Sequence, residues 1–200
     1  MQKSERVSAS PATLLRLSFA DARAWAAWLR KHHDASSGLW LQLAKKGARV
    51  ASVTYAEALE EALCWGWIDG QRAPLDREAW LQRFTPRGPR SIWSKINREK
   101  AEALIACGRM QAAGHAAIAL AKENGRWEAA YDSQRTATVP EDLAAALEAH
   151  PRAKEFFANL DSANRYAVLF RLHHAKLPET RARKLHQFVE MLEKGERLHG

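Results

Sequence analysis

The hydrophobic periodicity of this chain changes at about residue 91, and this change limits the folds that are open to it. Upstream, the leucines of LWLQL, residues 39–43, fall at every second position, which is the period of a β-strand, and residues 80–84 read as another strand. Downstream of Ser91, apolar residues recur at helical spacing almost to the end of the chain. The pattern predicts a small α/β unit followed by a helical one.

A capping box begins the helix that follows the first strand. Thr54 and Glu57 have the spacing in which each side chain bonds the backbone of the other, and Gly66 is placed to end the helix. The stretch WIDGQ after it reads as a strand or turn. The helix is expected to bury one apolar stripe, made of Tyr55, Leu59, Ala62 and Leu63.

The second half of the chain reads as a succession of helices. Ser91 is expected to begin a helix that stops at Gly108, and residues 132–139 are the one stretch that reads as a linker. The last helix has a clear apolar face, made of Leu185, Phe188, Val189 and Leu192. We therefore expect two domains, an α/β region over residues 12–131 and a helical module over 138–198.

Charge is distributed unevenly along the chain, whose formal net charge is +8. Residues 83–110 hold seven basic and two acidic residues, whereas residues 111–150 hold three basic and six acidic ones. A basic segment followed by an acidic one favours a local anion site over a uniform nucleic-acid-binding surface. The alternative is a solvated, arginine-rich surface.

The cysteines and the N-terminus indicate a reducing compartment. Cys64 and Cys107 are too few for a disulfide framework. Cys64 lies near the end of an apolar helix, where the helix dipole raises a thiol pKa, so we interpret it as a small buried hydrophobe. The N-terminus lacks the apolar run of a signal peptide, and no apolar run is long enough to span a membrane. We expect a cytoplasmic protein without membrane insertion.

No cofactor or metal is expected. The histidine pairs His32-His33 and His173-His174 are adjacent on helices and diverge, and no metal-ligand spacing occurs. Phosphate-cradling glycine motifs are also absent from the sequence. The basic run of Lys176, Arg181, Arg183 and Lys184 reads mainly as helix surface.

The strongest candidate site is RFTPRGPRSIWSKINREK, residues 83–100, which carries six basic residues and one acidic one. Arginines precede the expected start of a helix at Ser91, where free backbone N–H groups favour an anion. The ligand would be a phosphate, a carboxylate or an acidic peptide, with WGWIDGQ forming one wall. The alternative is a solvated basic loop whose Trp93 packs inward. The candidate ligand-binding residues are Trp67, Asp69, Arg83, Arg87, Trp93, Ser94, Lys95 and Asn97.

Five segments, taken in order, resemble the YdeI/OmpD-associated (bacteriocin-protection) family. They are GLWLQLAKKG, TYAEALEEALCWGWIDGQ, LQRFTPRGPRSIWSKIN, GRWEAAY and AKLPETRARKLHQFVEMLEKGER. The resemblance implies an α+β fold, with a small antiparallel sheet packed with helices and a C-terminal helical module. It also implies a role in protection against bacteriocins or antimicrobial peptides, and the family name alone implies association with a porin. It supplies no catalytic residues.

Three functions remain open at this point. The first is a non-enzymatic binding or stress-protection protein with an anion-receptive groove. The second is an enzyme that acts on a small anionic substrate, with Asp69 as general acid or base. The third is a nucleic-acid-binding protein that uses the basic face.

Overall fold

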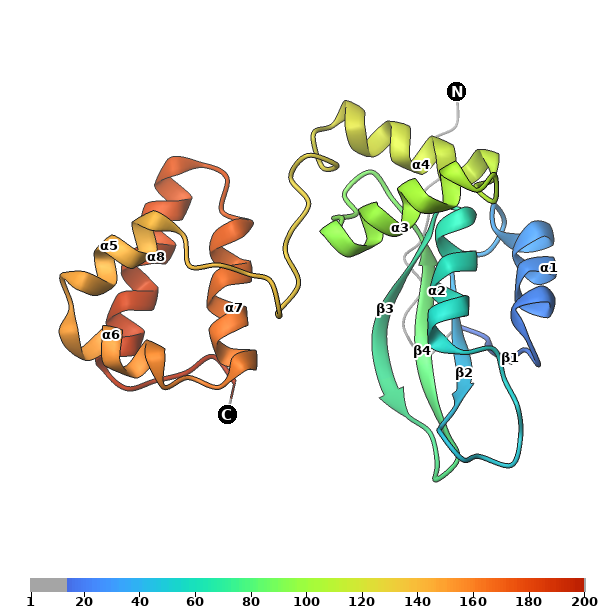
Figure 1. Cartoon of the computed structure of the whole chain (residues 1–200), viewed down its shortest axis with the longest axis horizontal. Coiled ribbons are helices and arrows are strands. Elements are labelled where there is room, and N and C mark those ends of the chain that lie inside the picture. Colours follow the sequence, from blue (N-terminus) through green and yellow to red (C-terminus); the bar gives the residue numbers. More distant parts are fainter. Residues whose placement is uncertain (1–13, 200) are drawn as a thin grey trace. The chain divides into compact units, whose positions relative to one another are not determined.

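A computed structural model describes residues 14–199, which divide into two compact units (Figure 1). The first unit contains the described residues up to Trp93 together with Asn97–Ala130, and the second contains Ser94–Ile96 and the residues from Tyr131 onward. The fold is α+β, as the sequence predicts. Residues 12 and 13, at the expected start of the first domain, lie outside the described residues.

The first unit is built on a four-stranded sheet. Its strands are β1 (Arg16–Ser18), β2 (Leu39–Ala44), β3 (Trp67–Pro74) and β4 (Ala79–Pro86), in the order β1-β2-β4-β3. The pairs that β4 makes with β2 and with β3 are antiparallel, but β1 lies parallel to β2. The sheet is therefore mixed, which corrects the expected antiparallel sheet. A three-residue edge strand is too short to show a sequence period.

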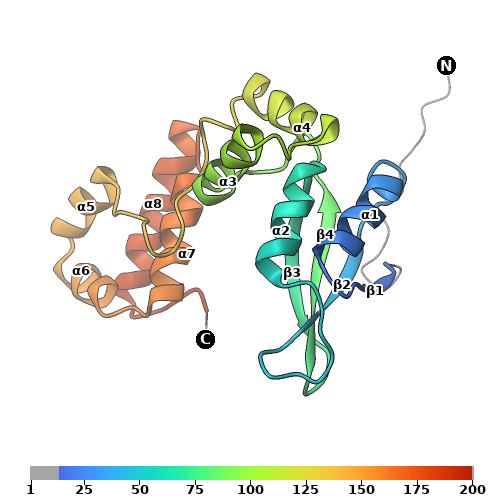
Figure 2. The same ribbon diagram turned by 45° about the vertical axis from the view of Figure 1, so that its right-hand side comes forward.

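Helices α1 (Ala22–His32) and α2 (Tyr55–Cys64) pack on one face of this sheet (Figure 2). The leucines of β2, which fall at alternate positions, point to this face and are buried with Trp25 of α1. The indole nitrogen of Trp25 donates to the carbonyl of Ala58 at 3.1 Å, which fixes α1 against α2. The core of the unit therefore lies between these helices and the sheet.

Helix α2 begins and ends as predicted, except in one residue of its buried stripe. The Thr54 hydroxyl accepts from the Glu57 amide, and the Glu57 carboxylate accepts from the Thr54 amide, so the capping box is confirmed. Tyr55 is an exception, because its side chain is 39% exposed and its hydroxyl donates to Asp69 at 2.8 Å. A tyrosine at the first helical position reaches the rim of the sheet, where its hydroxyl stays solvated.

A β-bulge explains the polar run DGQ in β3. The pairing of β3 with β4 shifts register between Asp69 and Arg72, which leaves backbone carbonyls without ladder partners. The buried amide of Gln82 donates to the carbonyls of Gly70, at 2.9 Å, and Gln71, at 3.3 Å. Gln82 is therefore a core residue that satisfies the bulge.

Helix α3 (Lys95–Ala106) begins four residues later than the sequence predicts. Ser91 instead closes a turn, because its hydroxyl accepts from the Gly88 amide and its own amide donates to the Gly88 carbonyl. Trp93, which lies between that turn and the helix, is buried. The expected helix start at Ser91 is therefore wrong, since the serine is used in a turn that places Trp93 in the core.

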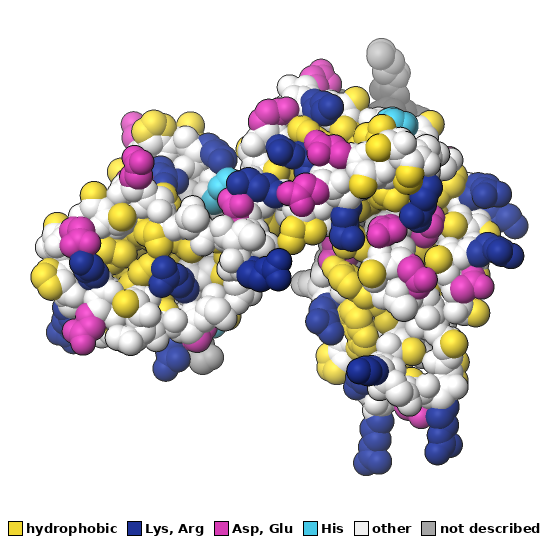
Figure 3. Space-filling model, in the orientation of Figure 1, with side chains coloured by type: hydrophobic (Ala, Val, Ile, Leu, Met, Phe, Trp, Pro, Cys, Tyr) yellow, Lys and Arg dark blue, Asp and Glu magenta, His cyan; other side chains and the backbone are white. Residues whose placement is uncertain are grey.

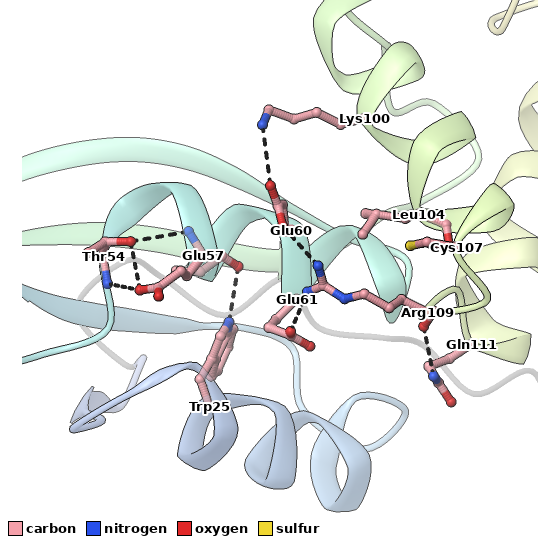
Figure 4. Close-up of polar contacts among 11 residues, drawn as sticks. Trp25, Thr54, Glu57, Glu60, Glu61, Lys100, Leu104, Cys107, Arg109 and Gln111 are labelled. Atoms are coloured by element: carbon pink, nitrogen blue, oxygen red, sulfur yellow. Dashed lines mark hydrogen bonds and ion pairs between the residues drawn. The ribbon is translucent and has the colours of Figure 1, made fainter.

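Arg109, just before α4 (Ala112–Glu123), joins this end of the unit to α2 (Figure 4). Its guanidinium nitrogens lie 3.0 Å from a Glu60 oxygen and 2.6 Å from a Glu61 oxygen. Lys100 of α3 lies 3.7 Å from Glu60. The network fixes α2 against the segment between α3 and α4 by charge-assisted hydrogen bonds.

The second unit contains four helices packed around their own core. They are α5 (Glu141–Glu148), α6 (Pro151–Ala158), α7 (Ser162–His173) and α8 (Pro178–Glu193). On α8, Phe188, Val189 and Leu192 are buried, which confirms most of the predicted stripe, whereas Leu185 is half-buried. No helix within residues 14–199 has the length and hydropathy required to cross a lipid bilayer.

Arg181 links three helices of this unit. Its guanidinium binds Asp142 of α5 through two parallel bonds, of 2.5 and 2.8 Å, and also donates to the Leu172 carbonyl of α7 at 2.8 Å. The sequence pattern predicts that this arginine lies mainly on the helix surface. It is instead a half-buried structural residue, because the planar guanidinium can serve a carboxylate and a carbonyl at once.

Candidate functional site

The first unit contains an open groove of about 690 Å³. It lies between the loop after α1, the WGW turn that joins α2 to β3, the end of β4 and helix α4. Its lining residues include His33, Ser36, Trp65, Pro86, Arg87 and Ala117. A groove of this size can hold a small molecule or a few residues of a peptide.

The motifs WGWIDGQ and FTPR meet at the floor of this groove. Gly66 has a positive φ of 70°, and a Cβ there would lie 2.7 Å from the Ala113 carbonyl oxygen, so α4 packs directly against the turn. The amide of Arg87 donates to the Gly66 carbonyl at 2.8 Å. The turn requires glycine both for its backbone conformation and for its close contact with α4.

The two tryptophans that flank Gly66 have different environments. Trp67 is fully buried, and its indole nitrogen donates to the His33 carbonyl at 3.0 Å. Trp65 is half-buried and packs on the imidazole of His33, with ring centroids 4.6 Å apart. Both tryptophans line the groove, but Trp65 exposes more of its ring there than Trp67 does.

Arg87 lines the groove, and its guanidinium is held in a fixed position behind the groove wall, with Nε and Nη2 buried. The centre of its guanidinium lies 3.5 Å from the centroid of the Trp93 ring, and Nη1 donates to the Ile92 carbonyl at 3.0 Å. Stacking on the indole and this hydrogen bond both restrict the side chain. Because a guanidinium stays protonated at any physiological pH, the charge is permanent.

Polar groups lie on the opposite side of the groove, in the loop after α1. The ring of His33 donates from Nδ1 to the Leu29 carbonyl at 3.0 Å, and Ser36 exchanges hydrogen bonds with Gly38. Asp34 also lines the groove and is exposed. The arrangement combines a cation, hydroxyl and imidazole groups and an indole face, which suits a small anion that carries apolar atoms.

Asp69 and Arg83, two of the predicted ligand-binding residues, lie on opposite faces of the sheet. Asp69 pairs with Phe84, so its side chain lies on the helix-covered face, where it accepts from Tyr55. Arg83 precedes Phe84 and therefore points to the other face. The structure does not bring this carboxylate and this arginine together, and neither residue lines the groove.

The other predicted residues divide between core and surface. Trp93 is buried and packs edge-on against Trp127, with ring centroids 4.8 Å apart, and Asn97 is also buried. Trp93 therefore packs inward, as the alternative interpretation of this segment predicts, and its ring supports Arg87 from the protein interior.

Ser94 and Lys95 belong to the second unit, where the Lys95 ammonium pairs with Asp132 at 2.8 Å. Trp67 and Arg87 are the two predicted residues that line the groove.

Sequence reasoning missed His33, Ser36 and Trp65 as lining residues. Trp65 could have been found, because two tryptophans on either side of a helix-ending glycine cannot share one environment. His33 and Ser36 reach the groove because the loop after α1 packs beside β3. A local sequence pattern does not predict this long-range packing. Within residues 14–199, no group of three or more metal-ligating side chains lies together.

Charges on the surface are mixed. On the face drawn in Figure 3, Lys and Arg side chains are interspersed with Asp and Glu side chains over each unit. This distribution resembles an ordinary solvated surface more than a continuous basic track.

Two family models match this α+β protein of two units. Residues 17–117 match the family described as Domain of unknown function (DUF8412), and residues 136–195 match the family described as Bacteriocin-protection, YdeI or OmpD-Associated. The chain belongs to the first family, whose model matches just over half of it, and its helical unit is similar to the YdeI/OmpD-associated family. No curated protein and no solved structure matched the chain.

Proposed function

We propose that this chain is a non-enzymatic binding protein whose first unit takes a small anionic ligand in the groove beside Arg87. The observation that carries the proposal is the fixed position of the Arg87 guanidinium, stacked on Trp93 at the wall of a 690 Å³ groove. A pre-positioned guanidinium attracts a carboxylate or phosphate electrostatically without first losing side-chain entropy.

The ligand class follows from the other groups in the groove. Trp65 offers a half-buried indole ring, and Ser36 and His33 offer short-range polar contacts. Asp34 at the rim disfavours highly charged anions, because like charges repel. We therefore expect an organic carboxylate or monophosphate with an apolar portion, or the acidic end of a peptide.

Binding without catalysis is supported by the chemistry of the groove. Its fixed charge belongs to an arginine, which does not exchange protons under physiological conditions. Asp69, the candidate acid or base, accepts a hydrogen bond from Tyr55 and does not line the groove. An enzyme of this kind would use a carboxylate or an imidazole as acid or base. In this groove the His33 ring is held by the Leu29 carbonyl and by Trp65, and Asp34 is exposed at the rim.

A protective role would then operate through ligand capture in the cytoplasm. The family description names bacteriocin protection, and the net charge of +8 disfavours direct sequestration of cationic peptides. We propose that the protein binds an anionic metabolite or an acidic segment of a partner. Neither a nucleic acid nor a porin is required by the groove.

Thermal unfolding in the presence of anions tests this proposal. Organic acids, nucleoside monophosphates, sugar phosphates, acidic peptides and short oligonucleotides are screened against the full chain. A ligand at about 100 times its Kd adds roughly 2.7 kcal/mol of stability. We expect at least one organic anion to raise the Tm of the wild type and to lose this effect in Arg87→Gln.

The matched control is Arg90→Gln, which removes the same charge three residues away at an exposed position. It should bind the anion as the wild type does. The proposal fails if no anion raises the Tm of the wild type, or if both variants lose the effect equally. Preference for oligonucleotides, with a steep dependence on salt, would instead support nucleic-acid binding.

A further inference from the structure

A second cavity lies wholly within the helical unit and does not depend on the groove described above. It has a volume of about 380 Å³ and lies between the segment that precedes α5, helix α7 and the start of α8. Three aromatic rings, those of Tyr131, Tyr166 and Phe170, form much of its wall. This volume is within the range of pockets that bind small molecules.

These rings hold one another in place. Tyr131 meets Phe170 edge-on, with centroids 5.0 Å apart and an interplanar angle of 84°, and Tyr166 lies 5.8 Å from Phe170. The Tyr166 hydroxyl donates to the Asp132 carbonyl at 2.8 Å, which connects α7 to the segment before α5. An aromatic wall that is already ordered binds a flat ring at small entropic cost.

Charged side chains surround the cavity, and most are already neutralised. Arg181 binds Asp142, and Asp132 binds Lys95. Lys176 is exposed. Of the charged residues that line the cavity, it is the one that has no ion pair or hydrogen bond to another residue within 14–199. The residues that line the cavity therefore combine three aromatic rings with one ammonium that has no ion pair within residues 14–199.

We propose that this cavity binds a small aromatic carboxylate. Its ring would pack against Tyr131, Tyr166 and Phe170, and its carboxylate would meet Lys176. The combination selects the ligand class, because an apolar aromatic molecule lacks a partner for the ammonium and an aromatic amine is repelled by it. This site is separate from the proposed anion groove, and neither site requires the other.

The three tyrosines of the chain make the test specific. Tyr131 and Tyr166 line the cavity, whereas Tyr55 lies in the first unit. The full chain with ring-labelled tyrosine is titrated with indole-3-acetate and, in parallel, with tryptamine, which has the same ring and the opposite charge. The acid should shift the Tyr131 and Tyr166 signals and leave Tyr55 unchanged, and the amine should bind about tenfold more weakly or not at all.

Two charge-reversal variants complete the test. Lys176→Glu should weaken binding of the acid about five- to tenfold, since it replaces attraction by repulsion at a partly exposed site. Arg183→Glu makes the same change at an exposed position of α8 that does not line the cavity, and it should leave the affinity unchanged. Arg87→Gln should not alter the tyrosine shifts, which separates this site from the groove.

Three results would overturn the proposal. They are the absence of any Tyr131 or Tyr166 shift up to about 10 mM acid, equal affinity for the acid and the amine, and equal affinity of Lys176→Glu and the wild type. Because Lys176 is exposed, its substitution leaves the packing of the unit intact, and unchanged tyrosine signals without ligand verify this.

Discussion

The guanidinium carbon of Arg87 lies over the indole of Trp93, 3.5 Å from the ring centroid, at the wall of the groove. The buried tryptophan thus serves as a support that determines where the positive charge stands. This relationship joins two motifs, because FTPR supplies the cation and WSKIN supplies the surface beneath it. Substitutions at position 87 should therefore separate the effect of charge from that of shape.

Arg87→Lys keeps the charge and removes the planar fork. We expect it to weaken binding of an organic anion about tenfold, or ~1.4 kcal/mol, because an ammonium does not stack as a plate on the indole and its charge is no longer fixed at the groove. Isothermal titration calorimetry measures the loss. Arg90→Lys is the control and should leave Kd unchanged; a similar loss in that variant would contradict the role of Arg87.

Gly66 and Gly125 form a matched pair for testing the close contact of α4. Both have a positive φ, of 70° and 71°, but a Cβ at Gly66 would lie 2.7 Å from the Ala113 carbonyl oxygen, whereas nothing lies within 4 Å at Gly125. Gly125→Ala should cost about 1 kcal/mol for backbone strain. Gly66→Ala should cost roughly 2 kcal/mol more, because α4 must also move.

Tryptophan fluorescence during urea unfolding measures this difference in the first unit alone, since all eight tryptophans lie there. Equal midpoints for the two variants would mean that α4 does not pack against the WGW turn as described.

The Asp142–Arg181 pair should make the stability of the second unit depend on pH. The Arg181 guanidinium holds the pKa of the Asp142 carboxyl below its ordinary value of 3.8. The stabilisation is therefore fully present above pH 3.8 and is lost as the pH falls through the lower pKa of the folded state. Asp142→Asn should remove about 1 kcal/mol at neutral pH, after allowance for solvent screening, and should remove this part of the acid sensitivity.

Far-UV circular dichroism at several pH values follows the helices of both units. Tryptophan fluorescence follows the first unit alone, so a change in dichroism without a change in fluorescence belongs to the second unit. The pair does not act as described if the variant shows the pH profile of the wild type, or if fluorescence changes as much as dichroism.

The two cysteines should differ sharply in reactivity. Burial, aided by the negative charge of Glu61, raises the pKa of the Cys64 thiol to about 11. At pH 8 its thiolate fraction is therefore about 10⁻³. Cys107 is exposed. A thiol reagent at pH 8 should modify one thiol of the native protein quickly, and Cys107→Ser should abolish that phase. Its persistence in Cys107→Ser would contradict the burial of Cys64.

The Arg109 network offers a test by salt. Arg109 bonds Glu60 and Glu61 from partly exposed positions, so its charges are screened by added ions. Arg109→Gln should destabilise the first unit by about 1 kcal/mol at low ionic strength and by clearly less in 1 M salt. A loss that does not change with salt would indicate packing of the side-chain stem instead of ion pairing.

Local rules allowed the larger part of the fold to be predicted. The capping box at Thr54, the helix end at Gly66 and the period of LWLQL each act over a few residues, and the structure confirms them. Ser91 misled because a serine caps a turn as readily as a helix. Strand β1 was missed, because its parallel partner, β2, lies some twenty residues away in the chain.

The candidate site could be predicted less completely. The charge pattern indicates Arg87, and the WGWIDGQ motif indicates Trp67. Asp69 and Arg83 lie on neighbouring strands, but the alternation of side chains along each strand places them on opposite faces of the sheet. His33 and Ser36 carry no local signal, because the return of the chain after α1 brings them to the groove. The role of Arg181 likewise depends on Asp142, which lies 39 residues earlier.

The most direct measurement of the central claim uses the indole N–H signals of the eight tryptophans. Two-dimensional ¹H–¹⁵N NMR spectra of the full chain are recorded while an anion selected by thermal unfolding is added. Occupation of the groove should shift the Trp65 signal strongly, since this ring lines it, and should leave the Trp80 and Trp127 signals in place. Saturable binding with an unmoved Trp65 signal, or unchanged Trp65 shifts in Arg87→Gln, would contradict it.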